Sequence, residues 1–189
     1  ALGSTVVPRR LFWMPMTDAR ESQAPIWKEA DPSGSLRRHA TWLNDLARKT
    51  FLSDKTHVEI FFLLKADGTG GLAQPPVGMD RNEFLAALKG YLKEHDIFGV
   101  IHIAETWSYF PKRPNDHTMK QIVQGEIAVS ELNQGDKTEA LMVRVECRDG
   151  TQHLWINPIR RTTSAVDLAA PIEMDDQMGG RFGGLFDGT

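Results

Sequence analysis

Two segments of this chain are apolar on both of their alternating faces, and this feature restricts the fold most strongly. Residues 57–66 contain the run IFFLL, and residues 97–109 place isoleucines in one register and phenylalanine, valine and alanine in the other. A strand that is apolar on both faces is usually covered on both sides in the folded protein. The sequence therefore predicts two interior strands of one sheet.

Apolar residues at helical spacing predict two main helices beside these strands. Residues 35–50 show this spacing after the breaker sequence DPSG, with Ser35 as the expected N-cap. Residues 80–95 show it again, and Asp80 with Glu83 three residues later forms a capping-box pattern. Each helix precedes one of the two apolar strands, which indicates an α+β arrangement.

A third feature is the dipeptide DG at 149–150, which lies between two alternating runs in residues 138–157. This pattern is typical of a hairpin with a two-residue type I′ turn. Counting outward pairs Glu146 with His153 and assigns to the core face Leu141, Val143, Val145, Leu154 and Ile156. The opposite face then holds Met142, Arg144, Glu146, His153 and Trp155. A slip of one residue would invert one strand relative to the other, so the register is testable.

Together these segments predict an α+β fold with a mixed sheet of four or more strands, two main helices and a C-terminal β-hairpin. The strand order stays open, and residues 57–109 are a candidate right-handed strand–helix–strand crossover. We expect an extended N-terminal arm over 1–30, a compact α+β domain over 31–161 and a Gly-rich acidic C-terminal tail over 162–189.

Both ends of the chain carry large apolar side chains without a helical or strand period. Leaving such a side chain exposed forfeits about 2–3 kcal/mol, so we expect these residues to be sheltered by the chain's own core or by a partner. The leading hypothesis is a non-catalytic assembly or interaction subunit, bound to other proteins or to copies of itself. The expected partner contacts are Phe12, Trp13, Trp27, Phe182, Leu185 and Phe186.

Acid–base side chains on the two apolar strands support a second hypothesis. If the strands are neighbours, His57, Glu59 and His102 could converge, with Glu105 nearby. Such a set suits a small metal-dependent or acid–base hydrolase. The chain lacks a ligand spacing such as H-E-x-x-H. We therefore favour a core histidine satisfied by a hydrogen bond over a metal ligand, and we assign no metal or other cofactor.

A third hypothesis is weak binding of single-stranded nucleic acid through residues 109–120. Aromatic and basic side chains suit base stacking and phosphate contact, and this loop holds Tyr109, Phe110, Lys112, Arg113, His117 and Lys120. The whole chain has 22 basic and 25 acidic residues and a net charge of −3, which favours a solvated loop over a nucleic-acid partner.

The glycine cluster GTGGLA at 68–73 fits the pattern G-x-G-x-x-A after a predicted strand. A dinucleotide site needs a helix that starts inside this pattern, but QPP follows here. A hairpin loop is therefore the favoured interpretation.

The chain has a single cysteine, Cys147, which excludes an intrachain disulfide and a multi-thiolate metal site. The hairpin count puts this thiol in the core, where burial raises its pKa and makes it a poor nucleophile. No apolar run is longer than residues 60–64, which is far below the roughly 20 residues of a membrane span. We expect no membrane partner and a cytoplasmic setting.

Overall fold

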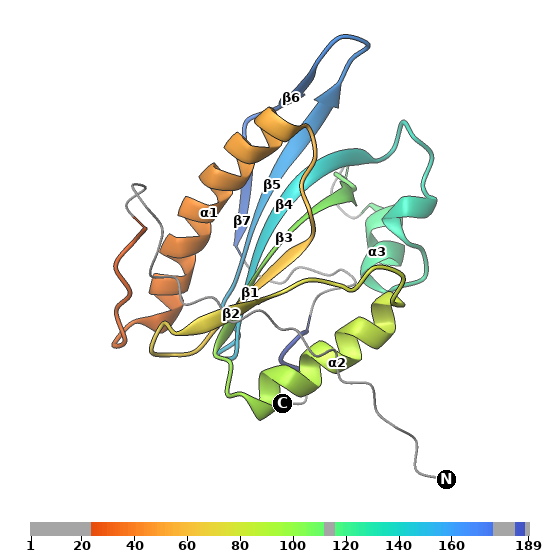
Figure 1. Ribbon diagram of the computed structural model, residues 1–189. Helices are drawn as coiled ribbons and strands as arrows, with labels where there is room; N and C mark the ends of the chain where they lie inside the picture. Colours follow the sequence, from red (N-terminus) through yellow and green to blue (C-terminus); the bar gives the residue numbers. More distant parts are fainter. Residues whose placement is uncertain (1–23, 112–115, 176–183, 188–189) are drawn as a thin grey trace.

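The computed structural model describes residues 24–111, 116–175 and 184–187, which form a seven-stranded sheet with helices packed against it (Figure 1). The elements in chain order are α1 (Pro32–Asp54), β1 (Ile60–Leu64), β2 (Gly70–Ala73), α2 (Arg81–Glu94), β3 (Gly99–Ser108), α3 (His117–Val123), the 3-10 helix η2 (Val129–Glu131), β4 (Thr138–Cys147), β5 (Gln152–Arg161), β6 (Val166–Leu168) and β7 (Ile172–Asp175). The strand order is β2-β1-β3-β4-β5-β6, and β7 also pairs with β5. The predicted α+β class, with two main helices and more than four strands, is confirmed.

The strand pairings between described residues are all antiparallel, including that of β1 with β3. The direct parallel crossover expected over 57–109 is therefore wrong, because the sequence analysis missed β2. This strand returns from β1 through the pairs Leu64↔Gly70 and Phe61↔Ala73. As a result, α2 connects β2 to β3, two strands of the same direction with β1 between them.

The glycine cluster thus forms an edge strand and the turn before it, in place of a phosphate loop. A Cβ on Gly70 would lie 2.2 Å from the carbonyl oxygen of Leu63, so the close approach of β1 requires glycine there. Gly68 has a φ of +84° in the turn that joins the two strands. The backbone demands of a tight ribbon explain these two glycines.

The β4–β5 hairpin forms as expected, but its register differs by one residue from the prediction. Glu146 pairs with Gln152, and Cys147 N–H donates to the Thr151 carbonyl at 2.9 Å. The loop therefore has three residues, and Gly150 at its end has a φ of +87°. This is the arrangement of a type I turn followed by a left-handed residue, which is another common hairpin loop containing glycine.

The slip moves the side chains of β5 to the faces opposite those predicted. Val145 pairs with His153 and Val143 with Trp155, so Trp155 lies on the same face as Val143. The prediction that Leu154 and Ile156 share a face with the odd-numbered residues of β4 is wrong. The predicted pairing of Glu146 with His153 is wrong as well.

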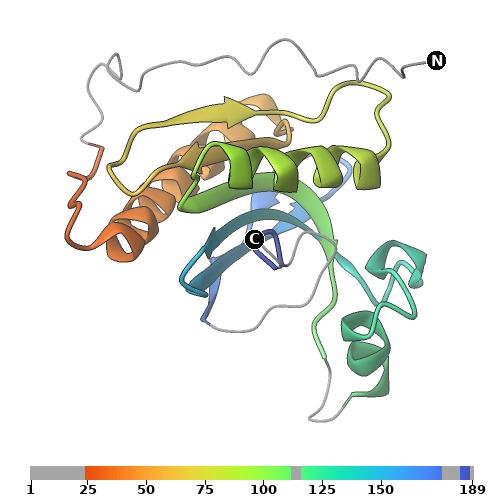
Figure 2. The same cartoon turned by 90° about the horizontal axis from the view of Figure 1, so that it is seen from below.

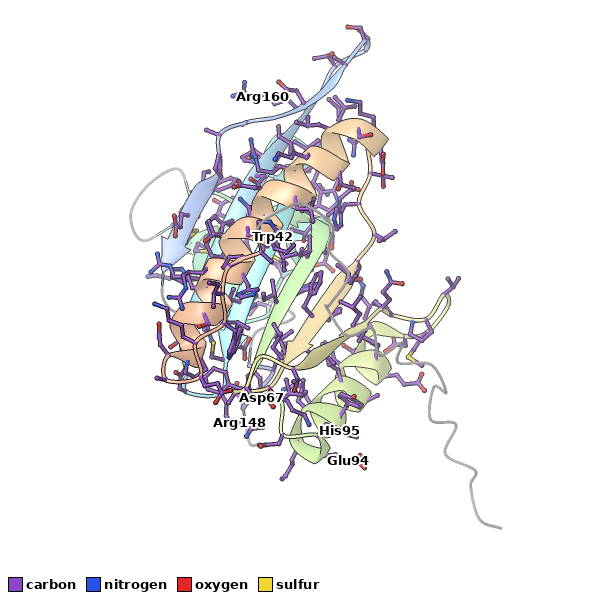
Figure 3. The ribbon with its side chains drawn as sticks, turned by 60° about the vertical axis from the view of Figure 1, so that its left-hand side comes forward. Trp42, Asp67, Glu94, His95, Arg148 and Arg160 are labelled. Atoms are coloured by element: carbon purple, nitrogen blue, oxygen red, sulfur yellow. The ribbon has the colours of Figure 1, made fainter. Side chains whose placement is uncertain are left out.

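Helix α1 covers one face of the sheet along β4, β5 and β6 (Figure 1). Its buried residues Leu36, Leu43 and Phe51 pack in one cluster with Val143 and Trp155. Trp42 lies on the same helix and is partly buried against this cluster (Figure 3). Cys147 is in the cluster too and is 1% exposed, and burial with the nearby Asp149 charge raises its pKa to about 12. The predicted core position of this thiol is therefore confirmed.

Helix α2 packs on the other face, where residues of the opposite parity point. Phe84, Leu88 and Leu92 of the helix form a second cluster with Phe61 and Val100 of the strands. The helix begins as predicted, because the Asp80 carboxylate accepts hydrogen bonds from Asn82 N–H and Glu83 N–H. Both faces of the central strands are thus covered, as their two-sided apolar pattern predicts.

Two boundaries differ from the expected ones. Asp31, rather than Ser35, caps α1, and Pro32 takes the first helical position, where its missing N–H is no loss. At the other end, the sheet continues past residue 161 into β6 and β7, both paired with β5. These two strands are too short to show a period in the sequence.

Candidate functional site

The centre of the candidate site is a contact between Glu59 and His102 on the face covered by α2. Nε2 of His102 lies 3.0 Å from Oε1 of Glu59, and the other oxygen of Glu59 lies 3.3 Å from a guanidinium nitrogen of Arg81. The imidazole also stacks on Phe61, with ring centroids 4.1 Å apart and planes 7° apart. Strand pairing sets this geometry, because Phe61 and His102 are direct partners on β1 and β3.

Burial and the contact between the two side chains shift the pKa of both groups. His102 is 2% exposed, and desolvation lowers its pKa against the opposing effect of the Glu59 hydrogen bond and charge. Burial raises the pKa of Glu59, but its hydrogen bond with His102 and the charges of His102 and Arg81 outweigh that effect and lower it. The pair therefore consists of a neutral imidazole and a carboxylate that accepts from Nε2–H, which leaves Nδ1 as the basic nitrogen.

A second ion pair lies on the same face of the sheet. Arg144 is the direct β4 partner of His102, and its guanidinium lies 3.2 Å from Oε2 of Glu146. Desolvation lowers the pKa of Arg144, and the Glu146 charge opposes this. The other oxygen of Glu146 accepts a hydrogen bond from Phe186 N–H at 3.3 Å. These contacts give the apolar face beneath α2 a buried polar strip, which runs from Glu59 to Glu146.

The structure does not bring all four sequence candidates together. His57 and Glu105 meet elsewhere, where His57 N–H donates to Oε1 of Glu105 at 2.5 Å and Arg161 lies 3.2 Å from Oε2. Glu105 has the parity of Ile103 and points away from the face of His102. His57 lies outside β1, so the alternation of that strand does not extend to it.

A metal centre finds no support among the residues that the structure describes. They contain no group of three or more His, Cys, Asp or Glu side chains arranged to hold an ion. Glu59 and His102 alone supply two ligand atoms, and Arg81 beside Glu59 adds a positive charge that opposes a cation.

Three of the expected partner contacts are described, and they pack against this chain. Trp27 Nε1–H donates to the Ala66 carbonyl at 2.9 Å, and its ring covers Gly68 in the β1–β2 turn. Leu185 is 2% exposed in the α2 cluster, with Phe186 partly buried beside it. Phe12, Trp13 and Phe182 lie outside the described residues.

The proposed nucleic-acid loop is described only in part. Phe110 is partly buried against the small cluster of Ala140, Leu154 and Ile156. Lys112 and Arg113 lie outside the described residues. Lys120 belongs to the short helix α3, which Asp116 caps.

The polar strip could not be predicted from the sequence, for identifiable reasons. Arg144 and Glu146 were expected on one face of the hairpin, and they do share a face, but nothing in the sequence placed that face next to His102. Nothing in the sequence placed Arg81, the residue after Asp80, beside Glu59. The sequence offered one signal for the strip, namely that Arg144 and Glu146 are charged residues two positions apart on an otherwise apolar strand.

No helix among the described residues is both long and apolar enough to cross a membrane. Comparison with known proteins finds no matching family model, no matching curated protein and no matching solved structure.

Proposed function

We propose that this protein is a non-catalytic assembly or interaction subunit, whose N-terminal arm contacts a neighbouring protein chain. The observation that carries this proposal is the anchoring of Trp27 on the β1–β2 turn by its hydrogen bond to Ala66. Trp27 lies where the arm of residues 1–30 joins the domain, so this contact fixes that junction beside the β1–β2 turn. β2 is the last strand in the strand order. An edge strand is a common site for pairing with another chain.

The surroundings of this edge support the proposal. β2 has the sequence GGLA, without the charged residues or proline that usually protect an exposed edge. Exposed apolar side chains flank the β1–β2 ribbon, with Val58 at 65% exposure before β1 and Val77 at 106% after β2. Ile26, next to Trp27, is 81% exposed. An arm that carries Phe12 and Trp13 has the chemistry to cover such residues on a neighbour.

The test is the oligomeric state of the full chain and of the double variant Phe12→Ser/Trp13→Ser, measured by size-exclusion chromatography with light scattering. We expect the wild type to associate and the variant to be monomeric, because aromatic anchors dominate interface energies. Leu52→Ser, on the exposed side of α1, is the matched control and should associate like the wild type. A monomeric wild type at all concentrations would refute the proposal.

The Glu59–His102 contact favours a second candidate function, that of a small acid–base hydrolase. A carboxylate that orients a neutral imidazole is a common arrangement of a general base. The test is hydrolysis of an activated ester such as p-nitrophenyl acetate by the wild type and by His102→Gln. Loss of turnover in this variant, but not in His57→Gln, would support catalysis. Equal rates in all three proteins would exclude it for esters.

A further inference from the structure

Residues 184–187, which we call the C-terminal strap, dock on this chain at one end of the polar strip. Leu185 packs in the cluster that includes Leu88 of α2, and Glu146 of β4 accepts a hydrogen bond from Phe186 N–H at 3.3 Å. The strap lies beside α2 in Figure 1, and Figure 2 shows it next to β3 and β4. The strap therefore contacts both the apolar cluster under α2 and the charged end of the strip.

The strip beneath the strap is closed to solvent at its ionisable groups. His102 is 2% exposed, Arg144 5% and Glu146 3%. Glu146 lies between the strap and Arg144, because one of its oxygens accepts the Phe186 N–H and the other lies 3.2 Å from the Arg144 guanidinium. Arg144 is in turn the direct strand partner of His102. A solute can reach these side chains only if part of their cover moves.

Size and packing distinguish the strap from α2, the other element on this face. α2 is a 14-residue helix with three buried side chains, whereas the strap has four residues, of which Leu185 is buried and Phe186 partly buried. Docking of the strap also has a cost, because it helps to keep the Arg144–Glu146 ion pair out of water. Local opening is easiest where little apolar surface is buried, so we expect the strap to open before α2 does.

We propose that the C-terminal strap is a gate to the polar strip, which excludes solutes from Arg144 and His102 when docked and admits them when undocked. The inference rests on the second candidate function, hydrolysis by the Glu59–His102 pair, and names how that site is regulated. The docked state is the inactive one, because a substrate has to reach Nδ1 of the buried His102.

The test is covalent labelling of Arg144 by phenylglyoxal in the full-length chain, followed at each arginine by peptide mass spectrometry. Arg37, on the exposed side of α1, is the accessible reference. We expect Arg144 to react more slowly than Arg37 in the wild type. In Leu185→Ser it should react at least about tenfold faster than in the wild type, because loss of a buried leucine disfavours docking. Circular dichroism shows whether each variant stays folded.

Two further variants separate the anchor from a general effect of substitution. Leu185→Met retains an apolar side chain of similar volume, so its Arg144 rate should match that of the wild type. Leu46→Ser, on the exposed side of α1, is the matched leucine-to-serine control and should also leave the rate unchanged. An Arg144 rate that Leu185→Ser does not change would overturn the proposal. So would a wild-type Arg144 that reacts as fast as Arg37.

A urea series on the wild type decides the question even if Leu185→Ser does not fold. Opening of a four-residue strap exposes little surface, so the Arg144 labelling rate should depend only weakly on urea below the unfolding transition. Global unfolding, followed by circular dichroism, has a much steeper dependence. Equal dependence of the two would mean that Arg144 is reached only by unfolding, and the proposal would be wrong.

Failure of the gate and failure of the hydrolase give different results. If both exist, Leu185→Ser hydrolyses p-nitrophenyl acetate faster than the wild type. Faster labelling of Arg144 in this variant, without hydrolysis that depends on His102, supports the gate and counts against the hydrolase. Hydrolysis that is lost in His102→Gln, together with an Arg144 rate unchanged in Leu185→Ser, refutes the gate and leaves the hydrolase standing.

Discussion

At the residue scale, His102 shows how a polar group is accommodated between the sheet and α2. A buried imidazole without a partner is costly, and here Glu59 bonds one nitrogen while Phe61 stacks on the ring. Arg81 in turn pairs with Glu59 from the first turn of α2. This contact chain ties the start of the helix to the central strands, so it has a structural role whether or not it has a catalytic one.

The pH dependence of stability should report on His102. Burial lowers its folded-state pKa, so between about pH 6.5 and that lowered pKa the unfolded state binds more protons than the folded state. The contribution of His102 is therefore intact above about pH 6.5 and is lost as the pH falls. We expect the free energy of unfolding, measured by urea titration, to decrease on acidification below about pH 6.5 and to decrease less steeply in His102→Gln. An unchanged slope in this variant would contradict the assignment, and His57→Gln is the control.

Asn157 offers a second prediction at this scale. Its side chain is fully buried, at 0% exposure, and its amide donates to Asn44 Oδ1 at 2.8 Å and to the Leu141 carbonyl at 2.9 Å. We expect Asn157→Ala to lower the free energy of unfolding by about 1–3 kcal/mol, because buried partners lose their hydrogen bonds. Asn133→Ala, in an exposed loop, is the control. Equal stability of the two variants in urea titrations would refute this role.

At the element scale, the hairpin shows what sequence alone can specify. Asp149 and Gly150 correctly predict a turn between β4 and β5, but both residues suit a two-residue loop and a three-residue loop alike. The choice depends on tertiary packing, because only the observed register turns Trp155 toward α1. The sequence therefore predicts the elements well and the faces of β5 badly.

The same limit applies to the candidate site. The alternation of each strand is visible in the sequence, so Glu59 and His102 are credible candidates. Their contact depends on the pairing of β1 with β3, which the intervening strand β2 makes antiparallel. A four-residue strand of sequence GGLA has almost no strand signal, so neither this pairing nor the separation of Glu105 could be predicted.

The three-residue loop predicts a strong preference for glycine at position 150. Its φ is +87°, a conformation that costs an L-residue about 1–2 kcal/mol. We expect Gly150→Ala to lower the free energy of unfolding by that amount. Gly135→Ala, in a loop where a Cβ would meet open space, should change it little. Equal effects of the two variants on urea unfolding would argue against the observed turn.

The two sides of α1 predict different effects of leucine truncation. Leu43 is 5% exposed and packs in the core, whereas Leu46 is 43% exposed on the same helix. We expect Leu43→Ala to lower the free energy of unfolding by about 2–5 kcal/mol, because it leaves a cavity. Leu46→Ala should cost far less, and thermal unfolding followed by circular dichroism compares the two. A larger loss in Leu46→Ala would mean that the helix presents a different face.

At the scale of the whole molecule, the turn that joins β1 to β2 and the turn that joins β4 to β5 lie on the same side of the sheet. Asp67 in the β1–β2 turn and Arg148 in the β4–β5 turn lie at the same end of the strands (Figure 3). Arg148 donates to the Ile97 carbonyl at 2.7 Å and pairs with Asp96, which ties the hairpin to the connection between α2 and β3. The seven strands and these connections thus form one framework.

Hydrogen exchange should rank the strands by their position in this framework. β3 and β4 have partners on both sides, whereas β2 and β7 are short and pair on one side among the described strands. Local opening is easiest where few buried contacts hold the backbone. We expect the slowest amide exchange, measured by mass spectrometry, in β3 and β4, and the fastest in β2 and β7. Exchange in β2 as slow as in β3 would show that its outer edge is covered.

The packing of α1 has a consequence for how the protein is made. Residues of α1 leave the ribosome before the strands that bury them, because their cluster extends to Leu168 on β6. At a synthesis rate of about 5–20 residues per second, the apolar side of this helix has to wait on the order of ten seconds for its covering strands. During that interval the apolar side of α1 stays exposed on the nascent chain, because the strands that bury it have not yet been made.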